Sequence, residues 1–385
     1  MQTFEMRKFV APEFIVGSNV RFLSGQYARN FGIRKLLIVT DRGVQNAGWI
    51  KEICDSLAQE KVEYVVYDKV SENPRDYEVM EGRDFYRSNQ CQGLLAVGGG
   101  SAIDCAKGIG IVVSSGKHIL EFEGVDKVIE AIPPLICIPT TSGTSSDVSQ
   151  FTIIRDMKRQ VKIAIISKAI VPDVSLIDPM VTTSMDPYVT ACTGIDALTH
   201  AIEAFSSNGS SVVTDNHAMN ALKIIKDNLK QAVDHPHDME ARYNMMVGSL
   251  EAGLAFSNAS LGAVHAMAHS LGGYKDLAHG ECNALLLTHV ISYNFDNIPE
   301  RFDIVGKIFG LELKGMTVKE KKKELLKSIG KFRKSVGIHN KLGDLGISGS
   351  DLPILSKNAA MDPCLITNPR SASKEDIESI FSEAL

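Results

Sequence analysis

The sequence predicts an α/β domain with a parallel sheet in the first half of the chain, followed by an all-α domain. Short apolar runs alternate with helical stretches up to about residue 180, and beyond that point the strand signals stop. Strands that alternate with helices are typical of βαβ units, whose strands run parallel. A length of 385 residues is sufficient for two domains. We therefore expect one domain over residues 1–181 and a second over residues 182–385.

The first domain is expected to contain a sheet covered by helices on both faces. The runs with strand character lie at residues 35–41, 62–68, 92–100, 133–144 and 174–179, and segments with helical spacing lie at 43–61 and 74–89. The strand runs are apolar at successive positions rather than at alternate ones. A parallel sheet with helices on both sides requires this pattern because neither face of the sheet meets water.

The second domain is expected to begin with a helix near residue 186. Asp186 can cap a helix, and Pro187 would occupy its first position, where a missing N–H costs nothing. Helical patterns then continue to the C-terminus. Because no low-complexity linker separates the two halves, we expect the domains to pack closely, with a ligand in the cleft between them.

Composition argues against a nucleic-acid-binding or membrane protein. The net charge is −5, and the basic run KEKKKELLK at 319–327 has the spacing of a solvated helix face. No apolar run reaches the ~20 residues needed to cross a bilayer. The seven cysteines are scattered singly, which favours reduced thiols. The charged N-terminal stretch does not resemble a signal peptide, so we expect a cytoplasmic protein.

Two polar loops follow successive expected strands. The first, AVGGGSAIDCAKG at 96–108, lies between a buried strand and a helix, where glycines and free N–H groups can bind a pyrophosphate. It is not a GxGxxG motif, and a tight turn without a ligand remains an alternative. The second, PTTSGTSSD at 139–147, is rich in hydroxyls and could instead be a turn cluster. Together the two loops favour a nucleotide-binding crevice.

Asp41 ends the first of these strands. A carboxylate at this place can accept hydrogen bonds from a ribose 2′-hydroxyl and would repel a 2′-phosphate. It could equally cap the helix that begins near Gly43. The residues alone leave both interpretations open.

Five residues of the second domain are candidate metal ligands or proton carriers. Asp196 and His200 are four residues apart, so a helix would place them on one face among apolar side chains. His265, His269 and His279 lie within fifteen residues of one another. A buried carboxylate needs a partner or a metal, and three or four such ligands suit Zn²⁺, Fe²⁺ or a similar ion. Hydrogen-bonded core residues are the alternative. Spacing alone favours His265 and His269 as joint ligands.

The motifs taken together resemble one family along nearly the whole chain, the iron-containing (group III) alcohol dehydrogenases. This family includes lactaldehyde reductases and 1,3-propanediol, butanol and methanol dehydrogenases. The resemblance rests on GGGSAID, PTTSGTSSD, GIDALTHAIEAF, GAVHAMAHSLGG, HGECNALLL and DPCLITNPR, in this order. It implies a Rossmann-like first domain, a helical second domain and a dehydroquinate synthase-like architecture.

The resemblance also assigns roles to individual residues. The metal ligands would be Asp196, His200, His265 and His279, and His269 would be a proton-transferring or substrate-positioning residue near the nicotinamide. The residues expected at NAD are Gly98, Gly99, Ser101 and Asp104 at the phosphates, Thr140, Thr141 and Thr144 along the cofactor, Lys162 at a ribose, and Asp41. The alcohol pocket would be lined by Phe151, Phe256 and Cys364, for which plain core packing is the alternative. Asp147, Glu281, Cys282 and Thr288 depart from the residues common in relatives and bear on substrate identity.

We therefore predict a metal-dependent, NAD-linked oxidoreductase that interconverts a small primary alcohol and its aldehyde. The metal is expected to be Fe²⁺, while Zn²⁺, Mn²⁺, Co²⁺ or Ni²⁺ suit the same ligands. The chain is expected to form a homo-oligomer, a dimer or larger. Two alternatives are a metal- and NAD-dependent lyase of the dehydroquinate synthase type and a non-catalytic metal- or nucleotide-binding protein. The lyase would need basic residues near the histidines for a phosphorylated substrate, and the sequence shows no such cluster.

Overall fold

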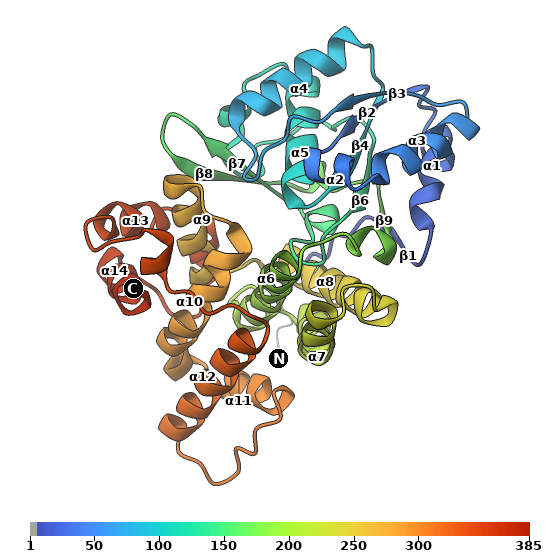
Figure 1. The fold of residues 1–385 in the computed structure, drawn as a ribbon. Helices are drawn as coiled ribbons and strands as arrows, with labels where there is room; N and C mark the ends of the chain where they lie inside the picture. The colour runs from blue at the N-terminus through green and yellow to red at the C-terminus, as the bar shows by residue number, and fades with distance from the viewer. Residues whose placement is uncertain (1–5) are drawn as a thin grey trace.

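The computed structural model describes residues 6–385 and contains the α/β half and the helical half that the sequence predicts (Figure 1). The first half is built on a six-stranded sheet with the order β1-β9-β6-β4-β2-β3, in which every neighbouring pair is parallel. Its strands are β1 (Glu13–Val16), β2 (Lys35–Val39), β3 (Glu63–Tyr67), β4 (Gly93–Gly98), β6 (Leu135–Pro139) and β9 (Val174–Ile177).

Helices cover both faces of this sheet. They are α1 (Ser24–Asn30), α2 (Arg42–Asn46), α3 (Trp49–Gln59), α4 (Asp76–Ser88) and α5 (Gly100–Ser115). In β4, Leu94 and Ala96 belong to the apolar cluster on one face, while Leu95 and Val97 belong to the cluster on the other. This two-sided burial explains the continuous apolar runs. The helix expected over 43–61 is divided into α2 and α3 at Gly48, whose φ of 89° only glycine adopts readily.

A second, three-stranded sheet was not predicted from the sequence. Its order is β5-β8-β7, with β5 (Gly124–Val125), β7 (Phe151–Asp156) and β8 (Val161–Ile166). Strands β7 and β8 form an antiparallel hairpin around a turn in which Gln160 has a positive φ of 55°. The hairpin extends from the α/β half toward the helical half (Figure 1). The β-branched residues on both sides of a polar turn were the available signal.

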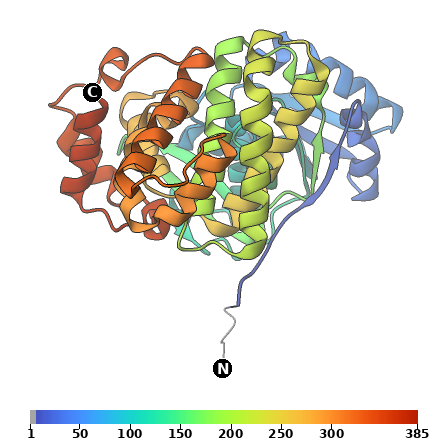
Figure 2. The same ribbon diagram turned by 90° about the horizontal axis from the view of Figure 1, so that it is seen from below.

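The helical half begins with α6, as expected. Asp186 accepts hydrogen bonds from the N–H groups of Tyr188 and Val189, and Pro187 occupies the first helical position. The helices are α6 (Pro187–Ser206), α7 (Val212–Asp234), α8 (Met239–Ala259), α9 (Ala263–Lys275), α10 (His279–Asn294), α11 (Pro299–Ile308), α12 (Val318–Ser335), α13 (Leu352–Ala359) and α14 (Lys374–Ala384). The long helices α6, α7 and α8 pack side by side (Figure 2). The change from strands to helices falls between Ile177 and Pro187, the interval that contains the expected boundary at residue 181.

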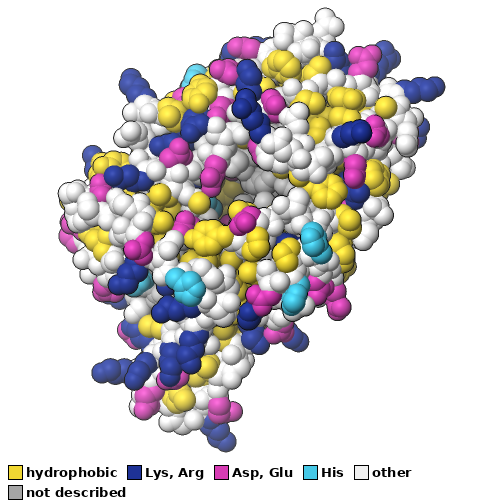
Figure 3. All heavy atoms as spheres, in the orientation of Figure 1, with side chains coloured by type: hydrophobic (Ala, Val, Ile, Leu, Met, Phe, Trp, Pro, Cys, Tyr) yellow, Lys and Arg dark blue, Asp and Glu magenta, His cyan; other side chains and the backbone are white. Residues whose placement is uncertain are grey.

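The basic run at 319–327 lies on α12, where Leu325 and Ile329 are buried and the lysines are on the outside. It is therefore the solvated helix face that the sequence predicts. Basic and acidic side chains are interspersed over most of the face drawn in Figure 3. Within residues 6–385, no helix is long and apolar enough to cross a bilayer. The first five residues of the N-terminal stretch lie outside the described residues.

The two halves meet closely where the end of α9 crosses β8. A Cβ atom on Gly273 would lie 2.6 Å from Val161 Cα and 2.7 Å from the Lys162 nitrogen, and a Cβ on Gly272 would lie 2.7 Å from Lys162 Nζ. Real Cβ atoms do not approach other atoms this closely, so only glycine allows α9 to lie against the strand. The position of α9 relative to the sheet domain depends on this contact.

We expect Gly273→Ala to destabilise the protein, because the added methyl group must push the backbones of α9 and β8 apart. Overpacking of this kind costs roughly 1–3 kcal/mol, which lowers the melting temperature by about 2–4 °C per kcal/mol in domains of this size. Gly330→Ala on α12 is the matched control, since a Cβ there meets nothing within 4 Å. It should stabilise its helix by about 0.5–1 kcal/mol. A Gly273→Ala variant that melts with the wild type would contradict the close contact.

Candidate active site

The cleft between the two halves contains two adjoining cavities. The inner one is lined from the α/β side by residues that include Ser101, Thr144 and Lys162, and from the helical side by residues that include Phe256 and His269. The outer one is lined by Asp41, Thr140, Thr141 and Gly99 among others, and Ser101 borders both. Figure 3 shows a hollow between the two halves of the molecule. The residues predicted to bind the cofactor and those predicted to bind the metal therefore border the same cleft.

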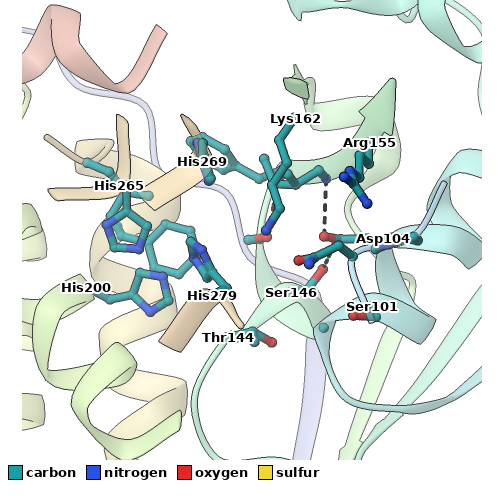
Figure 4. A pocket seen from close by; sticks show the side chains of 18 residues that line it. Ser101, Asp104, Thr144, Ser146, Arg155, Lys162, His200, His265, His269 and His279 are labelled. Atoms are coloured by element: carbon teal, nitrogen blue, oxygen red, sulfur yellow. Dashed lines mark hydrogen bonds between the residues drawn. The ribbon is translucent and has the colours of Figure 1, made fainter. Parts of the chain in front are cut away.

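Asp196, His200, His265 and His279 come together at the inner cavity. Each offers one ligand atom, and these four atoms lie within 4.8 Å of one another. Asp196 Oδ1 is 4.0 Å from Nε2 of His200, 3.7 Å from Nε2 of His265 and 3.8 Å from Nε2 of His279. Three helices contribute, since α6 carries the first two residues, α9 the third and α10 the fourth. Figure 4 shows the three rings close together on one side of the cavity.

The hydrogen bonds of these histidines fit a cation at the centre of the group. Nδ1 of His200 lies 3.2 Å from the Gly143 carbonyl oxygen, and Nδ1 of His265 lies 2.5 Å from Glu203 Oε2. Both partners are acceptors, so each Nδ1 carries a proton, and each Nε2 presents a lone pair when its ring is neutral. The amide Nδ2 of Asn283, which lies 3.2 Å from Nε2 of both His265 and His279, offsets part of the repulsion between these lone pairs and the carboxylate oxygen, and a cation between them would remove it. The donor set of three imidazoles and one carboxylate therefore suits a divalent metal.

Burial and neighbouring charges shift the pKa values of these four groups in different directions. Burial alone would raise the pKa of Asp196, but His200, His279 and His265 outweigh it and hold the carboxyl below its usual range. Burial lowers the pKa of His200 to about 3 and lowers that of His279 as well. For His265, burial is outweighed by Glu203 and Asp196, which raise its pKa to about 9. A negative carboxylate beside two neutral imidazoles is the state in which these groups bind a metal.

His269 faces the same cavity but stands outside the group of four. Its Nδ1 lies 2.8 Å from Asp362 Oδ2, and its ring stacks on that of His279 with 5.3 Å between the centroids. The residue that joins Asp196, His200 and His265 is thus His279, and the spacing argument that paired His265 with His269 does not describe this geometry. Asp362 fixes the ring of His269 by its Nδ1 edge, which leaves Nε2 for the cavity.

The glycine loop between β4 and α5 packs directly against the second polar loop. A Cβ on Gly99 would lie 3.1 Å from the Thr141 side chain, and one on Gly100 would lie 2.8 Å from that of Thr144. A Cβ on Gly98 would lie 2.6 Å from Ala102. Helix α5 begins here without a side-chain cap, so its first N–H groups remain available to a ligand. The two loops predicted to bind a nucleotide therefore form one surface.

Asp41 fits both interpretations that the sequence leaves open. Its Oδ1 accepts a hydrogen bond of 3.0 Å from the Val44 N–H, so it does cap α2. The same residue borders the outer cavity beside Thr140 and Thr141. One carboxylate oxygen can cap the helix while the other faces the cavity.

Asp104 and Lys162 both reach the inner cavity. The carboxylate of Asp104 accepts hydrogen bonds from Ser146 Oγ and from the Ile153 N–H (Figure 4). Lys162 Nζ has no hydrogen-bond partner within residues 6–385, and burial lowers its pKa. Lys162 is half-buried, and an ammonium without a partner there is costly, so this group is available to bind an acceptor in the cavity.

The three residues predicted for the alcohol pocket do not all line the cavity. Phe151 and Phe256 do, with ring centroids 5.7 Å apart, and Phe256 also stacks on His200 at 4.3 Å. Cys364 instead lies outside the lining, fully buried, and its N–H donates to Asp362 Oδ1. It follows Asp362 in a short 3₁₀ turn that packs behind His269, which explains why it does not reach the lining.

The positions that depart from the common family residues do not reach the cleft. Glu281 accepts hydrogen bonds from the Tyr188 hydroxyl and the Asn340 amide, Asp147 accepts one from Ser175, and Cys282 is fully buried. None of these, nor Thr288, lines either cavity. Their chemistry therefore bears on packing rather than on the substrate directly.

Three polar residues of the site were not selected from the sequence. Glu203 contacts His265, Asp362 contacts His269, and Asn283 Nδ2 donates to Asp196 Oδ1 at 2.5 Å. All three lie inside quoted motifs, namely HAIEAF, DPCLITNPR and HGECNALLL. Helical spacing was the signal that could have identified Glu203, three residues after His200, and Asn283, four residues after His279, since each shares a helix face with a proposed ligand.

Comparison with known proteins decides the family. The family model described as "iron-containing alcohol dehydrogenase" matches residues 11–179, and that described as "Fe-containing alcohol dehydrogenase family, C-terminal" matches residues 190–385. The chain belongs to the iron-containing alcohol dehydrogenase family. It is therefore an oxidoreductase of the alcohol dehydrogenase type, as its motifs predict.

The relatives of this alcohol dehydrogenase match it over nearly its full length. The 1,3-propanediol dehydrogenase of Klebsiella pneumoniae is 36% identical, with 99% of this chain and 100% of that protein covered. The NAD-dependent methanol dehydrogenase of Bacillus methanolicus is 34% identical, with coverage of 98% and 99%. The crystal structure of a 1,3-propanediol oxidoreductase superimposes with a TM-score of 0.95 at 36% identity, covering 99% of this chain and 100% of the other.

His265→Ala and His279→Ala should each lose bound metal, because each removes one of the four converging ligand atoms. His269→Ala should retain the metal and lose rate, by roughly 10²–10⁴-fold if it moves a proton. The measurement is metal content per chain, after purification without oxygen, together with kcat. Retention of metal in His265→Ala with loss in His269→Ala would reverse the assignment.

Proposed function

We propose that the protein catalyses the reversible, NAD-linked oxidation of a small primary alcohol to its aldehyde with a divalent metal. The observation that carries this proposal is the grouping of Asp196, His200, His265 and His279 in a cleft that the two cofactor loops also border. Names of relatives, among them 1,3-propanediol dehydrogenase, NAD-dependent methanol dehydrogenase and lactaldehyde reductase, support the substrate class and the cofactor.

NAD would lie along the two cavities. Its pyrophosphate would bind at the uncapped start of α5. Gly98 and Gly99 would allow close approach of the backbone, and Ser101 would lie beside the phosphates. The adenosine ribose would then lie in the outer cavity beside Asp41, and Thr140 and Thr141 would contact the cofactor between the two ends. Lys162 and Thr144 border the inner cavity and would contact the nicotinamide half. Asp104 is held by Ser146 and Ile153, so it would act on the cofactor by placing Ser146.

The metal would be held by the four converging residues at the inner end of the cleft. Bound there, a divalent ion supplies Lewis acidity toward an alcohol or aldehyde oxygen. Fe²⁺ is proposed because of the family, and Zn²⁺, Mn²⁺, Co²⁺ or Ni²⁺ suit the same ligands. The side chains of Phe151 and Phe256 exclude water from the alcohol carbon, which favours hydride transfer over side reactions.

His269 would move the proton that the alcohol hydroxyl releases. Asp362 accepts the Nδ1 proton, so Nε2 is the nitrogen that can accept a further proton from the cavity side. The Asp362–His269 pair thus leaves Nε2 of His269 as the basic nitrogen on the cleft side. The carboxylate of Asp362 would stabilise the imidazolium that forms.

The two other candidate functions receive no support. Family membership argues against both the dehydroquinate synthase-type lyase and a non-catalytic binding protein. Among the described residues, the cations that line the inner cavity are Arg155 and Lys162, and Arg155 is already paired with Asp276 at 2.6 Å. A homo-oligomer and a cytoplasmic location remain predictions from the sequence.

The test of the function is formation of NADH from NAD⁺ and a series of alcohols by metal-loaded protein, with Phe256→Ala measured beside wild type. If Phe256 bounds the alcohol, its removal should raise kcat/KM for longer alcohols relative to ethanol. Each methylene that finds room contributes about 0.8 kcal/mol, or about fourfold.

Phe31→Ala is the control for this series, since Phe31 lies on the surface and outside both cavities. Because Phe256 also stacks on His200, metal content is measured in each variant. If kcat/KM depends on alcohol chain length in the same way in a folded, metal-loaded Phe256→Ala protein as in wild type, Phe256 only packs in the core and does not bound the alcohol. Absence of NADH formation with every alcohol in wild type would refute the proposed function itself.

Asp41→Gly should shift cofactor preference from NAD toward NADP, because it removes a hydrogen-bond acceptor for the ribose and a charge that repels the 2′-phosphate. Loss of a charged hydrogen bond should cost NAD roughly 1.5–3 kcal/mol, about ten- to a hundredfold in kcat/KM. The measurement is kcat/KM for both cofactors at fixed salt.

Asp41→Asn separates the two roles of this residue, since asparagine caps a helix as well as aspartate does but carries no charge. It should also gain NADP activity while α2 stays capped. If neither variant changes the ratio of NAD to NADP activity, Asp41 acts as a helix cap alone.

A further inference from the structure

Glu203 is a buried acid that belongs to the same helix face as two of the proposed metal ligands. Asp196, His200 and Glu203 are spaced four and three residues apart on α6, which brings all three to one side of the helix. Glu203 is 4% exposed, and its helix neighbours Ala197, Ala201 and Ala204 are part of the apolar core. A carboxylate in such surroundings needs strong partners.

Both oxygens of Glu203 are engaged by the start of α9. Oε1 accepts a hydrogen bond of 2.7 Å from the Val264 N–H, and Oε2 lies 2.5 Å from His265 Nδ1. Helix α9 has no side-chain cap of its own, because the preceding residue is Gly262. A Cβ on Gly262 would lie 2.9 Å from Glu203 Oε1, so the glycine leaves the room that this carboxylate occupies. Glu203 therefore joins α6 to α9 at the residue where His265 projects.

The three ligand histidines differ in what holds their second ring nitrogen. His200 is held by the backbone carbonyl of Gly143, and His279 Nδ1 has no hydrogen-bond partner within residues 6–385. His265 alone among them is held by a carboxylate. A carboxylate fixes the Nδ1–H tautomer more firmly than a neutral acceptor does and makes the opposite nitrogen a stronger ligand.

We propose that Glu203 is a positioning residue that sets the affinity of the site for its metal through His265. The proposal rests on the metal site described under the proposed function. Glu203 orients Nε2 of His265 toward Asp196 Oδ1, 3.7 Å away, and holds the two helices that carry three of the four ligands in one arrangement. Partners of this kind change metal affinity by roughly 10–100-fold when they are removed.

The test is the dissociation constant of Co²⁺ or Zn²⁺, measured by competition with a chelator on metal-depleted protein. Glu203→Gln keeps the size of the side chain and removes its charge, and it should weaken binding by roughly 10–100-fold. The visible spectrum of the Co²⁺ protein should also change, because His265 becomes a poorer donor. Loss of stability alone would lower the melting temperature of the metal-free variant and leave both readouts unchanged.

Glu251→Gln is the matched control. Glu251 Oε2 lies 2.5 Å from Nδ1 of His217, the same carboxylate–imidazole distance as at Glu203, but that pair is partly exposed and lines neither cavity. Its metal affinity should equal that of wild type. Equal weakening in both glutamine variants would overturn the proposal, as would a folded Glu203→Gln protein that binds metal within threefold of wild type.

A third variant covers the case in which Glu203→Gln does not fold. Glu203→Asp keeps the charge but is one methylene shorter, so it cannot hold both Val264 N and His265 Nδ1, and it should bind metal about tenfold more weakly. Wild-type affinity in Glu203→Asp would then refute the proposal.

His265→Ala distinguishes a failure of the proposed metal site from a failure of the role proposed for Glu203. If the His265→Ala protein retains metal, the proposed ligand set is wrong. If His265→Ala loses metal while the Glu203 variants bind metal with wild-type affinity, only the role of Glu203 is refuted.

Discussion

The buried carboxylate of Asp196 is the constraint on which the site depends. It is 1% exposed on a helix whose neighbouring side chains are apolar, and a charge in that position needs compensation. Nε2 atoms of three histidines and the amide of Asn283 surround it. The amide Nδ2 of Asn283 also lies 3.2 Å from Nε2 of both His265 and His279, so it supplies part of the positive charge that this group needs. The proposed metal would bind where these polar groups converge, and the apolar core of the helical half surrounds them.

The second constraint is close packing at glycines. Within the α/β half, Gly99 and Gly100 let the first loop lie on the side chains of Thr141 and Thr144, and between the halves Gly273 lets α9 lie on the backbone of β8. These contacts bring elements that bind different ligands to one cleft. The α/β half presents helix dipoles and hydroxyls suited to a nucleotide, and the helical half presents imidazoles suited to a metal. Hydride transfer between cofactor and alcohol requires this adjacency.

Much of this organisation could be predicted from the sequence, because it depends on local patterns. Continuous apolar runs identified the parallel strands, and Asp186 with Pro187 identified the start of α6. The β7–β8 hairpin was not predicted, although its strands have six residues each, because Arg155, Asp156 and Lys162 interrupt the apolar pattern on both sides of its turn. The family motifs named the four converging residues, whereas helical spacing alone selected His269, since His265 and His269 do share one face of α9.

The sequence by itself determined the fold class, the family and the residue types available for a metal and a nucleotide, because these follow from periodicity and from motifs of neighbouring residues. Only the tertiary structure decided which residues meet across distant segments. It paired Glu203 with His265 across 62 positions and Asp362 with His269 across 93, and it placed Cys364 outside the cavity. Such contacts arise from the packing of whole helices, which no local pattern specifies.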